Sequence, residues 1–387
     1  METLIRMTTV PISLEKLLEN QMGYMKSYYH IIAISAEEHA LNKVGLDQGV
    51  PTFALNLTRK ITPWTDLKAV FNLYRYLKEV KPKIIHTHTP KAGVVGMMAA
   101  KLAGVPIRMH TVAGLPLMET AGLKRRVLNF VEALTYACAT HVYPNSNGLK
   151  GIILEHKFCA ASKLKVLGSG SSNGIDTSKF SKNAVPPHVV RTLADQLHVS
   201  TDDFLFVFVG RLVVDKGIVE LVTAFKELSK IHKHIKLILV GPFESDLDPL
   251  PDSILEEINT NKQIIHTGYQ SDVRPYFAIS SILVFPSYRE GFPNVVLQAG
   301  AMELPSIVSN INGCNEIIHE GINGFIVPSK SVKPLQDAME YVLKNRALMN
   351  EMGRESRNYV EKSFQQSVIW EALLQEYKLL ERYVSNN

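Results

Sequence analysis

The sequence predicts an α/β protein built from two doubly wound domains, each with a parallel sheet covered by helices. Its 387 residues exceed what one hydrophobic core usually supports, and short apolar runs alternate with helical patterns along the chain. Between the halves lies a stretch rich in Gly, Ser, Asn and Pro, from Gly168 to Pro187, which favours a linker. We therefore expect a domain boundary near residue 180, with a ligand cleft between the strand ends of the two domains.

In the first half, apolar runs predict strands over residues 29–35 and 83–87, and helical periodicity predicts helices over 64–80 and 92–103. Strands that alternate with helices form βαβ units, and these build parallel sheets. Near the N-terminus, we expect Ser13 to be the N-cap of a short helix.

The second half repeats this alternation. Its apolar runs predict strands over residues 204–209, 235–240, 263–266 and 282–285. A short helix is expected over residues 295–302, opened by Pro293, and the C-terminal segment 368–383 has helical periodicity.

The composition is that of a globular protein, with 46% hydrophobic and 20% charged residues. No segment reaches the roughly 18 to 20 apolar residues that a membrane span needs, and the first residues do not resemble a signal peptide. Cys138, Cys159 and Cys314 have neither a disulfide framework nor metal-ligand spacing. These features predict a cytoplasmic protein.

The two halves differ in charge. Residues 1–180 carry 22 Lys and Arg against 12 Asp and Glu, whereas the rest carries 20 against 25. This asymmetry indicates an anionic partner for the first half, but no nucleic-acid module is present. An anionic membrane surface or a lipid diphosphate fits better, and an ordinary solvated basic face fits equally well. The candidate contacts are Lys81, Lys83, Lys124, Arg125 and Arg126.

The segment Glu290-Gly-Phe-Pro-Asn-Val-Val-Leu-Gln298 joins a predicted strand to a predicted helix. Glu290 therefore lies at the carboxyl end of a strand, the edge where open α/β sheets bind ligands. The helix that follows offers free backbone N–H groups to an anion. This arrangement and spacing are typical of a sugar-nucleotide site.

A second segment, Gly210-Arg-Leu-Val-Val-Asp-Lys-Gly217, follows the strand predicted over 204–209. Gly210 allows close backbone approach, and Arg211 and Lys216 can direct two cations at a diphosphate. The segment matches neither a Walker loop nor a dinucleotide-binding glycine motif. Taken alone, two such cations are more often ordinary surface charges.

Histidines mark two strand ends in the first half. His110 follows a predicted strand, and His86, His88 and Lys91 lie in another loop at a strand end. An isolated histidine is more often structural than catalytic. The His-x-His pair lacks a third ligand at metal-binding spacing, so no metal is expected.

Motifs in the second half, in their order and spacing, resemble the family 4 glycosyltransferases. They are Gly210-Arg-Leu with Lys216-Gly, Leu239-Val-Gly-Pro-Phe-Glu244, His266-Thr-Gly-Tyr-Gln270 and Phe285-Pro-Ser-Tyr-Arg-Glu-Gly-Phe292. The resemblance extends over the whole chain, and within the family the chain is similar to bacterial enzymes that build capsule, O-antigen or other lipid-linked oligosaccharides. That further likeness lies in Gly114-Leu-Pro-Leu117, Leu134-Thr-Tyr-Ala-Cys-Ala-Thr140, Pro144-Asn-Ser146 and Ser172-Asn-Gly-Ile-Asp176.

The resemblance implies a GT-B fold, in which two Rossmann-like domains enclose a cleft. The first domain would bind the acceptor and be completed by a C-terminal helix at about residues 366–387. The first domain would thus comprise residues 1–180 with that helix, and the second, residues 181–365, would bind the nucleotide-sugar donor.

The resemblance also implies roles for individual residues. Glu290 would hydrogen-bond the donor sugar, and His110 would lie beside the reacting centre, so both are the expected catalytic residues. The donor diphosphate would be held by Gly210, Arg211, Lys216, Asn294 and Val295. The nucleoside and sugar would contact Gly241, Gly268, Tyr269, Gly291, Phe292 and Gln298. The acceptor would contact His88, Lys91 and Gly114.

The chain departs from the family pattern at two places. The family usually has a glutamate where this chain has Gln298. A glutamine loses the charge-assisted hydrogen bond to ribose, at a cost of about 1 kcal/mol, and this keeps a non-catalytic binding protein open as an alternative. The other departure is the segment from Thr8 to Ser13, which replaces a Gly-rich loop found in many members.

The expected reaction moves a hexose or N-acetylhexosamine from a UDP sugar to a polyprenyl-diphosphate-linked saccharide, with retention of configuration. It would need no metal or cofactor, because Arg211 and Lys216 replace the metal, and Asp246-Leu-Asp248 lies beside a proline turn. The enzyme would act in bacterial surface polysaccharide synthesis at the inner face of the cell membrane. A sugar-nucleotide epimerase or a phosphorylase of the same fold is a further alternative. The absence of a recognisable pyridoxal-lysine context argues against the phosphorylase.

Overall fold

The computed structural model describes residues 1–58, 62–115, 122–244 and 248–386. The chain forms two compact units, the first comprising Met1–Asn173 with Gln366–Asn387 and the second Gly174–Gln365. The division falls inside the Gly- and Ser-rich stretch, earlier than residue 180. Asn173 belongs to the first unit because its side chain contacts Gln21 and Trp370, whereas Ile175 pairs with Gln365 in the second.

The first unit has a six-stranded sheet in the order β3-β2-β1-β4-β5-β6, with every pairing parallel. Its strands are β1 (Thr3–Met7), β2 (His30–Ser35), β3 (Thr52–Ala54), β4 (Ile84–His88), β5 (Ile107–Val112) and β6 (His141–Pro144). Its helices are α1 (Pro11–Leu17), α2 (Gln21–Met25), α3 (Glu38–Gln48), α4 (Pro63–Val80), α5 (Pro90–Ala103), α6 (Gly122–Cys138), α7 (Asn147–Glu155) and α16 (Gln366–Ser385).

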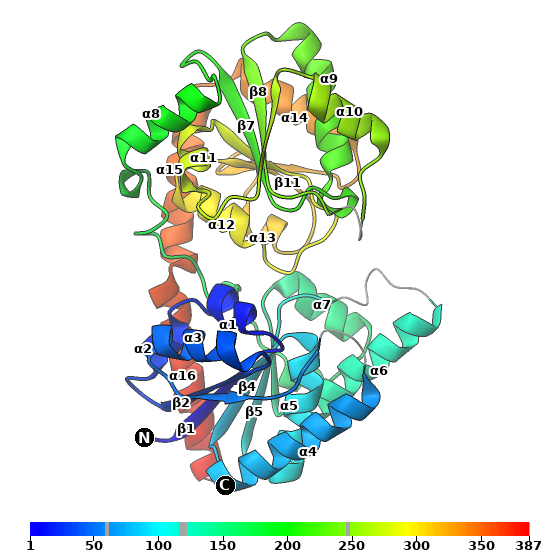
Figure 1. Ribbon diagram of the computed structural model, residues 1–387, viewed down its shortest axis with the longest axis vertical. Helices are drawn as coiled ribbons and strands as arrows, with labels where there is room; N and C mark the ends of the chain where they lie inside the picture. Colours follow the sequence, from blue (N-terminus) through cyan, green and yellow to red (C-terminus); the bar gives the residue numbers. More distant parts are fainter. Residues whose placement is uncertain (59–61, 116–121, 245–247, 387) are drawn as a thin grey trace. The chain divides into compact units, whose positions relative to one another are not determined.

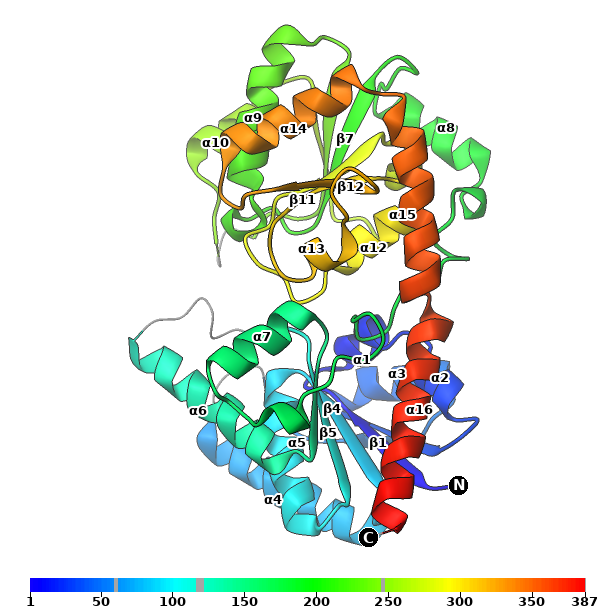
Figure 2. The same cartoon turned by 180° about the vertical axis from the view of Figure 1, so that it is seen from behind.

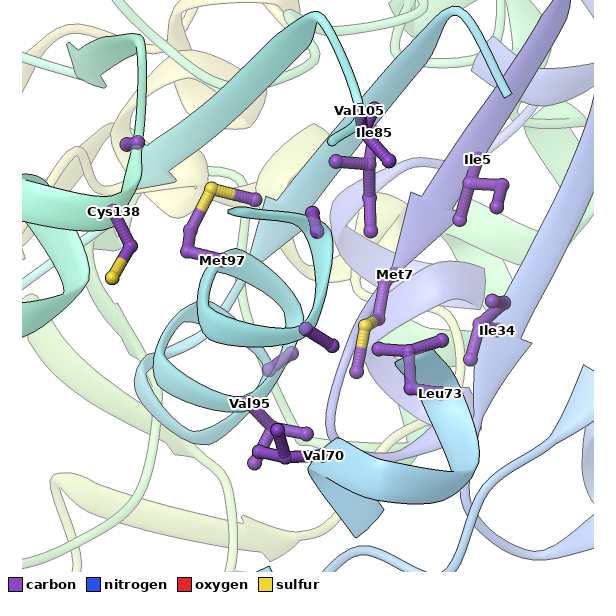
Figure 3. Close-up of a cluster of buried hydrophobic side chains, with 14 of the residues drawn as sticks. Ile5, Met7, Ile34, Val70, Leu73, Ile85, Val95, Met97, Val105 and Cys138 are labelled. Carbon is purple, nitrogen blue, oxygen red and sulfur yellow. The ribbon is translucent and has the colours of Figure 1, made fainter. Parts of the chain in front are cut away.

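Both faces of this sheet are buried, because successive strand residues point to opposite sides and helices pack against each side. On one face, Ile5 and Ile85 pack with Val70 and Leu73 of α4 and with Val95 of α5 (Figure 3). On the other face, strand residues such as Leu4 and Ile84 pack with Leu373 and Tyr377 of the C-terminal helix α16, which runs across the strands in Figure 2. The segment predicted as a C-terminal helix thus completes the first unit.

The second unit has a parallel sheet in the order β12-β11-β10-β7-β8-β9 (Figure 1). Its strands are β7 (Phe204–Val209), β8 (Ile235–Val240), β9 (Ile264–Gly268), β10 (Ile282–Phe285), β11 (Ser306–Ser309) and β12 (Gly324–Val327). Its helices are α8 (Pro187–Gln196), α9 (Ile218–Ile231), α10 (Asp252–Thr260), α11 (Arg274–Ile279), α12 (Asn294–Ala301), α13 (Cys314–Ile317), α14 (Val332–Lys344) and α15 (Leu348–Phe364).

The two sheets share one topology, which confirms the predicted pair of doubly wound domains. Counted from its own first strand, each unit has the strand order 3-2-1-4-5-6 of dinucleotide-binding folds. The direction of winding reverses between β1 and β4 in the first unit and between β7 and β10 in the second. Ligands of such folds bind outside the carboxyl ends of these central strands.

Most predicted elements are confirmed, and the strands predicted over 204–209, 235–240 and 282–285 have those bounds in the structure. The predicted helices begin one or two residues earlier than expected, at Pro63, Pro90, Asn294 and Gln366. The prediction of Ser13 as an N-cap is wrong. Helix α1 begins at Pro11 with Val10 as N-cap, so Ser13 lies inside the helix, because proline is pre-organised for a first helical position. Helix α12 begins at Asn294, and Pro293 is its N-cap. In the parts of the chain that the structure describes, no helix is both long and apolar enough to cross a bilayer.

Candidate active site

Three glycines bring the loops after β7, β8 and β9 together at the carboxyl edge of the second sheet. The amide N of Gly210 donates to the carbonyl O of Val240 at 2.9 Å, and that of Gly241 donates to Gly268 at 2.9 Å. A Cβ at Gly241 would lie 1.8 Å from the carbonyl O of Gly210, and the φ of Gly241 is +148°. Only glycine permits this approach. The structure therefore places three predicted donor-binding residues side by side.

A fourth glycine joins the β7 loop to the end of β10. Gly217 has a φ of +71°, and a Cβ there would lie 2.1 Å from the carbonyl O of Pro286. Beside it, the amide N of Tyr288 donates to the carbonyl O of Asp215 at 2.9 Å. The loop that carries Lys216 is thereby held against the loop that carries Glu290.

Lys216 and Glu290 form an ion pair within this corner. The Nζ of Lys216 contacts Oε1 of Glu290, and the hydroxyl of Ser287 donates to the same oxygen at 2.9 Å. The cation also lies 5.8 Å from the centre of the Phe285 ring. Both charged side chains are largely buried. Two residues predicted for different parts of the donor thus contact each other.

The loop after β11 supports the backbone around Glu290. The side-chain amide of Asn312 donates to the carbonyl O of Glu290 and, at 3.3 Å, to that of Gly291. Gly313 has a φ of +78°, and a Cβ there would lie 2.6 Å from the carbonyl O of Gly291. Neither Ser287 nor Asn312 was predicted to support the site. The Asn312-Gly313 dipeptide after an apolar run is the turn signal that indicates such a loop.

The second predicted cation, Arg211, has a different partner. Its Nη1 lies 2.6 Å from Oε2 of Glu244, in the loop after β8, and both side chains are partly exposed. Arg211 and Lys216 are therefore held by separate carboxylates on separate loops. Both lie in the loop after the central strand β7, as predicted. Neither is an isolated positive charge.

Polar contacts that the sequence did not predict hold the loop after β7. The hydroxyl of Tyr288 donates to the carboxylate of Glu220 on α9, with both oxygens at 2.8 Å. Burial and this carboxylate raise the pKa of Tyr288. Arg289 pairs with Asp215 at 2.9 Å, and the carboxylate of Asp248 accepts from the amide of Asp215 at 2.7 Å. These contacts fix the loop that positions Lys216.

The remaining predicted donor residues lie in or just before helix α12, except Tyr269, which follows β9. Asn294 and Val295 are the first two residues of this helix, and its N-terminus has no side-chain cap. Phe292 is buried against Phe364, with ring centres 5.3 Å apart, whereas Gln298 is half-buried one turn along the helix. Tyr269, after β9, is exposed. The helix start thus leaves backbone donors available at the predicted place.

In the first unit, His110 is buried within β5, two residues before the last residue of the strand, rather than after a strand as predicted. Its Nδ1 lies 2.8 Å from the hydroxyl of Thr87 on β4. A Cβ at Gly93 on α5 would lie 2.5 Å from Cε1 of the ring, so this glycine makes room for the imidazole. Burial lowers the pKa of His110 to about 4. The ring is therefore neutral at pH 7 and can exchange hydrogen bonds but carries no charge.

His86 and His88 lie within β4 rather than in a loop after it, and a buried arginine engages His88. The buried guanidinium of Arg6 contacts β4 and α2: its Nη2 donates to Nε2 of His88 at 2.9 Å and to the side-chain oxygen of Gln21. Arginine can only donate, so Nε2 of His88 is the acceptor and Nδ1 carries the proton. Burial and the neighbouring Arg6 lower the pKa of His88 well below its ordinary value. If His88 contacts the acceptor substrate as predicted, it must do so through Nδ1, its other ring nitrogen.

The same arginine orders His86 through the C-terminal helix. Nη1 of Arg6 donates to the hydroxyl of Tyr377 at 2.9 Å, and that hydroxyl is hydrogen-bonded to Nδ1 of His86 at 2.7 Å. Nε2 of His86 is hydrogen-bonded to the hydroxyl of Thr111 at 2.7 Å. This network was not predicted, because no local pattern relates α16 to β1 and β4.

Lys91, the other charged residue predicted for the acceptor, pairs with Asp66 of α4 at 2.5 Å and is largely buried. It follows Thr89, which has a φ of +75° and whose hydroxyl accepts from the amide of Thr9 at 3.1 Å. Gly114 is half-buried after β5. All the predicted acceptor residues therefore lie along the carboxyl edge of the first sheet, and His88 and Lys91 have protein partners. Pro116, Leu117, Asp246 and Leu247, which belong to motifs quoted above, lie outside the described residues.

The loop after β1, where the chain departs from the family pattern, lines a hollow of about 550 Å³. It lies between this loop and α3, again at the carboxyl edge. Its polar lining consists of Glu15, Glu37, Lys43, Asp47 and Thr58.

The five basic residues considered for an anionic partner do not form one surface. Lys81 is the C-cap of α4 and Lys83 precedes β4, so both lie at the amino edge of the sheet. Residues 124–126 lie in the first turns of α6, which begins at the carboxyl edge. Helices of a βαβ unit run in the opposite direction to its strands, so the end of α4 and the start of α6 lie at opposite edges of the sheet.

Within the described ranges, no group of three or more His, Cys, Asp or Glu side chains is arranged to hold a metal ion.

Two family descriptions match this chain in sequence. Residues 190–359 match the description "Glycosyl transferases group 1", and residues 33–170 match "Glycosyl transferase 4-like domain". A capsular polysaccharide biosynthesis glycosyltransferase of Staphylococcus aureus, CapM, is 33% identical over 322 residues, which are 83% of each chain. A galactosyltransferase of Escherichia coli that acts on a GlcNAc-diphosphoundecaprenol is 29% identical over 82% of this chain and 81% of its own.

Solved structures share the fold. A glycosyltransferase from Rickettsia africae superposes with a TM-score of 0.81 at 19% identity and covers 98% of both chains. The Anabaena protein HepE in complex with UDP has a TM-score of 0.80 at 17% identity, over 98% of this chain and 100% of that one. The sequence matches, the paired parallel sheets and the donor-side motifs agree, and the chain belongs to the family 4 glycosyltransferases of GT-B fold.

Proposed function

We propose that this glycosyltransferase moves a hexose or N-acetylhexosamine from a UDP sugar to a saccharide linked to a polyprenyl diphosphate. The observation that carries the donor side is the contact of Lys216 with Glu290 at the β7/β10 edge. The relatives support the acceptor class, since the E. coli enzyme and an N-acetylgalactosaminyltransferase of Campylobacter jejuni, 25% identical, both act on diphospho-undecaprenol saccharides. Among similar folds, HepE is known with UDP-glucose.

Lys216 is already paired with Glu290, so binding of the donor would break this ion pair. A diphosphate carries more negative charge than one carboxylate, so Lys216 turns to it, and the Glu290 carboxylate is released to accept hydroxyls of the donor sugar. Arg211 exchanges Glu244 for the diphosphate in the same way. The amides of Asn294 and Val295 add helix-end donors. These groups stabilise the charge that grows on UDP as the glycosidic bond breaks.

The proposed transfer proceeds with retention through front-face attack by the acceptor hydroxyl. Its support is the family resemblance together with the neutral state of His110, whose pKa is about 4. A neutral imidazole can hydrogen-bond the sugar without adding a positive charge beside an oxocarbenium-like centre. Glu290 orients the sugar and forms no covalent bond in this mechanism.

The proposal includes independence from metal ions and cofactors, because Arg211 and Lys216 supply the positive charge that a metal provides elsewhere. It assigns the acceptor to the first unit, where the edge holds His88, Lys91 and Gly114, and it places the reaction at the cytoplasmic face of the membrane, in bacterial surface polysaccharide synthesis. The S. aureus relative, named for capsule biosynthesis, supports that role.

The test measures release of nucleoside diphosphate from a panel of labelled sugar nucleotides, with and without a lipid-diphosphate saccharide, and in the presence of EDTA. One UDP sugar should be consumed in an acceptor-dependent way, and EDTA should leave the rate unchanged. Lys216→Ala and Glu290→Gln should each lower kcat by roughly 10² to 10³, the usual effect of removing a transition-state contact. Lys226→Ala is the matched control, since Lys226 pairs with Glu257 elsewhere in the same unit.

Binding of a sugar nucleotide without turnover on any acceptor would instead indicate the non-catalytic alternative that Gln298 leaves open. A glycosyl ester trapped on the Glu290 carboxylate of the wild-type enzyme, formed as UDP leaves and absent in Glu290→Gln, would contradict the orienting role of Glu290. Loss of activity in EDTA that manganese restores would contradict metal independence.

A further inference from the structure

Helix α4 exposes three large apolar side chains on one face. Trp64, Leu67 and Phe71 are 81%, 56% and 58% exposed. Their spacing of three and four residues puts them side by side on the first turns of the helix. The opposite face of α4 is buried, since Val70 and Leu73 pack in the core of the first unit (Figure 3). The exposed face is therefore a second apolar surface, beyond the one that the fold uses.

Helix α6 repeats this feature. Leu123 and Phe130 are 78% and 67% exposed, and Val127 lies between them on the same face. The spacing of four and three residues again makes one continuous stripe. The inner face of α6 buries Thr135 and Tyr136. Two helices of one unit thus expose aromatic and aliphatic side chains in a repeating pattern, whereas isolated exposed apolar residues are common on any protein.

The two stripes belong to the same region of the first unit. Helices α4 and α6 both pack against α5. Each follows a strand of the parallel sheet, so each begins at the carboxyl edge, and both views show the starts of α4 and α6 at the same side of this unit (Figures 1 and 2). The apolar residues occupy the first half of each helix. They therefore border the edge that holds His88 and His110.

Exposed cations accompany the apolar residues. Lys68 lies between Leu67 and Phe71 on α4, and Lys124 and Arg126 lie between Leu123 and Val127 on α6. All three are exposed. Interfacial helices combine apolar side chains that enter the lipid with cations that contact anionic headgroups. The charge of this surface is complementary to an anionic bilayer.

We propose that the exposed faces of α4 and α6, defined by Trp64, Leu67, Phe71, Leu123, Val127 and Phe130 with Lys68, Lys124 and Arg126, dock the protein on an anionic lipid bilayer. The aromatic and leucine side chains enter the headgroup region, and the cations contact the lipid phosphates. The inference rests on the proposed function in one respect, that a polyprenyl-linked acceptor presents its saccharide at the membrane surface. Docking by these helix starts brings the carboxyl edge of the first sheet to that surface.

Vesicle flotation tests the apolar part of this surface. The full chain should bind vesicles of phosphatidylcholine with phosphatidylglycerol and should bind phosphatidylcholine alone more weakly. The double variants Trp64→Ser with Phe71→Ser, and Leu123→Ser with Phe130→Ser, should each weaken binding roughly tenfold or more, because apolar burial on the bilayer is lost. The matched controls Leu46→Ser and Leu102→Ser remove exposed leucines of α3 and α5 and should change nothing.

Fluorescence locates the contact. The chain has two tryptophans, Trp64 and Trp370. Trp370 packs against Tyr24 and donates to Asn173, so vesicles should not change its surroundings. A blue shift of the emission on adding anionic vesicles, present in the wild type and absent in Trp64→Phe, is the expected result.

The electrostatic part is tested by Lys68→Gln, Lys124→Gln and Arg126→Gln together, which should weaken binding to anionic vesicles by roughly tenfold or more and reduce its salt dependence. The control Lys81→Gln with Lys83→Gln removes two cations at the opposite edge of the sheet and should have little effect.

Equal vesicle binding by the serine variants and their controls would overturn the proposal. A concentration-dependent dimer in sedimentation that the serine substitutions dissociate, with no vesicle binding, would also overturn it, since the apolar faces would then contact a second copy of the chain.

Failure of the proposed function is a separate result. If no sugar nucleotide is consumed while Trp64-dependent vesicle binding persists, the docking surface remains and the glycosyl-transfer proposal falls. If transfer to a water-soluble acceptor analogue is normal but the vesicles do not bind, only the docking surface falls.

Discussion

Lys216 and Glu290 were expected to bind different parts of one substrate, yet in the structure each is the partner of the other. Their positions after two central strands indicate a shared edge, because the carboxyl ends of parallel strands meet there. The contact itself depends on Gly217, which lets its loop lie against Pro286. A pair of this kind keeps both side chains ordered and charge-compensated until a more strongly charged ligand competes for the lysine.

Gly93 has a comparable role beside His110. Gly93→Ala would place a methyl group 2.5 Å from Cε1 of the imidazole. We expect the ring to be displaced and kcat to fall at least tenfold, because a small shift of a positioned group costs much of its effect. The helix itself gains from alanine, by about 0.5–1 kcal/mol, so any net loss of stability reports the clash.

Gly151→Ala is the matched control for that variant. It lies within α7, and a Cβ there meets nothing within 4 Å. We expect a small rise in melting temperature and unchanged kcat. Normal kinetics of Gly93→Ala would show that the position of His110 is unimportant for transfer.

Helix α16 shows how a whole element contributes to the site. Its apolar residues close one face of the first sheet, and its Tyr377 hydroxyl joins Arg6 to His86. Helical periodicity predicts the helix and its buried face. The hydroxyl contact is not predictable in this way, because Arg6 and Tyr377 are 371 residues apart in the sequence.

Tyr377→Phe should destabilise the first unit. The change keeps the packing of the ring but leaves a buried guanidinium N–H and Nδ1 of His86 without their partner, a loss of about 1–3 kcal/mol. Thermal unfolding followed by tryptophan fluorescence measures it, because Trp64 and Trp370 both belong to this unit. Tyr74→Phe, which alters a ring packed at the edge of the α4/α5 core, is the control and should change stability by less than about 0.5 kcal/mol. Equal stability of both variants would show that the network contributes little.

Considered as a molecule, the protein has two units of one topology but different charge, and the first contains three buried histidines. Burial lowers the pKa of His110 to about 4 and lowers those of His86 and His88 well below the ordinary value of 6.5. In the unfolded chain these rings take up protons near pH 6.5, whereas in the folded unit they do not. The unfolded state therefore binds more protons below that pH, and folding stability falls as the pH falls.

We expect acid to destabilise the first unit from about pH 6.5 downward, by about 1.4 kcal/mol per pH unit for each histidine. Burial also raises the pKa of Glu132 and Glu381, which acts in the opposite sense. The test therefore compares slopes. Denaturant unfolding monitored by tryptophan fluorescence at several pH values should show a slope for His110→Gln that is smaller by about one proton between pH 4.5 and 6. An unchanged slope would mean that His110 is protonated in the folded unit.

The local order of residues determined most of the architecture and the places of the functional groups. Strand and helix periodicity, turn glycines and the spacing of the donor motifs are short-range properties, so β7, β8 and β10 and the loops that carry Arg211, Lys216 and Glu290 could be predicted. An amphipathic pattern shows which residues share a helix face, but not which face the fold covers. Only tertiary packing decided that α4 and α6 expose Trp64 and Phe130, that Arg6 engages His88, and that Lys216 meets Glu290, because each of these outcomes depends on residues far apart in the sequence.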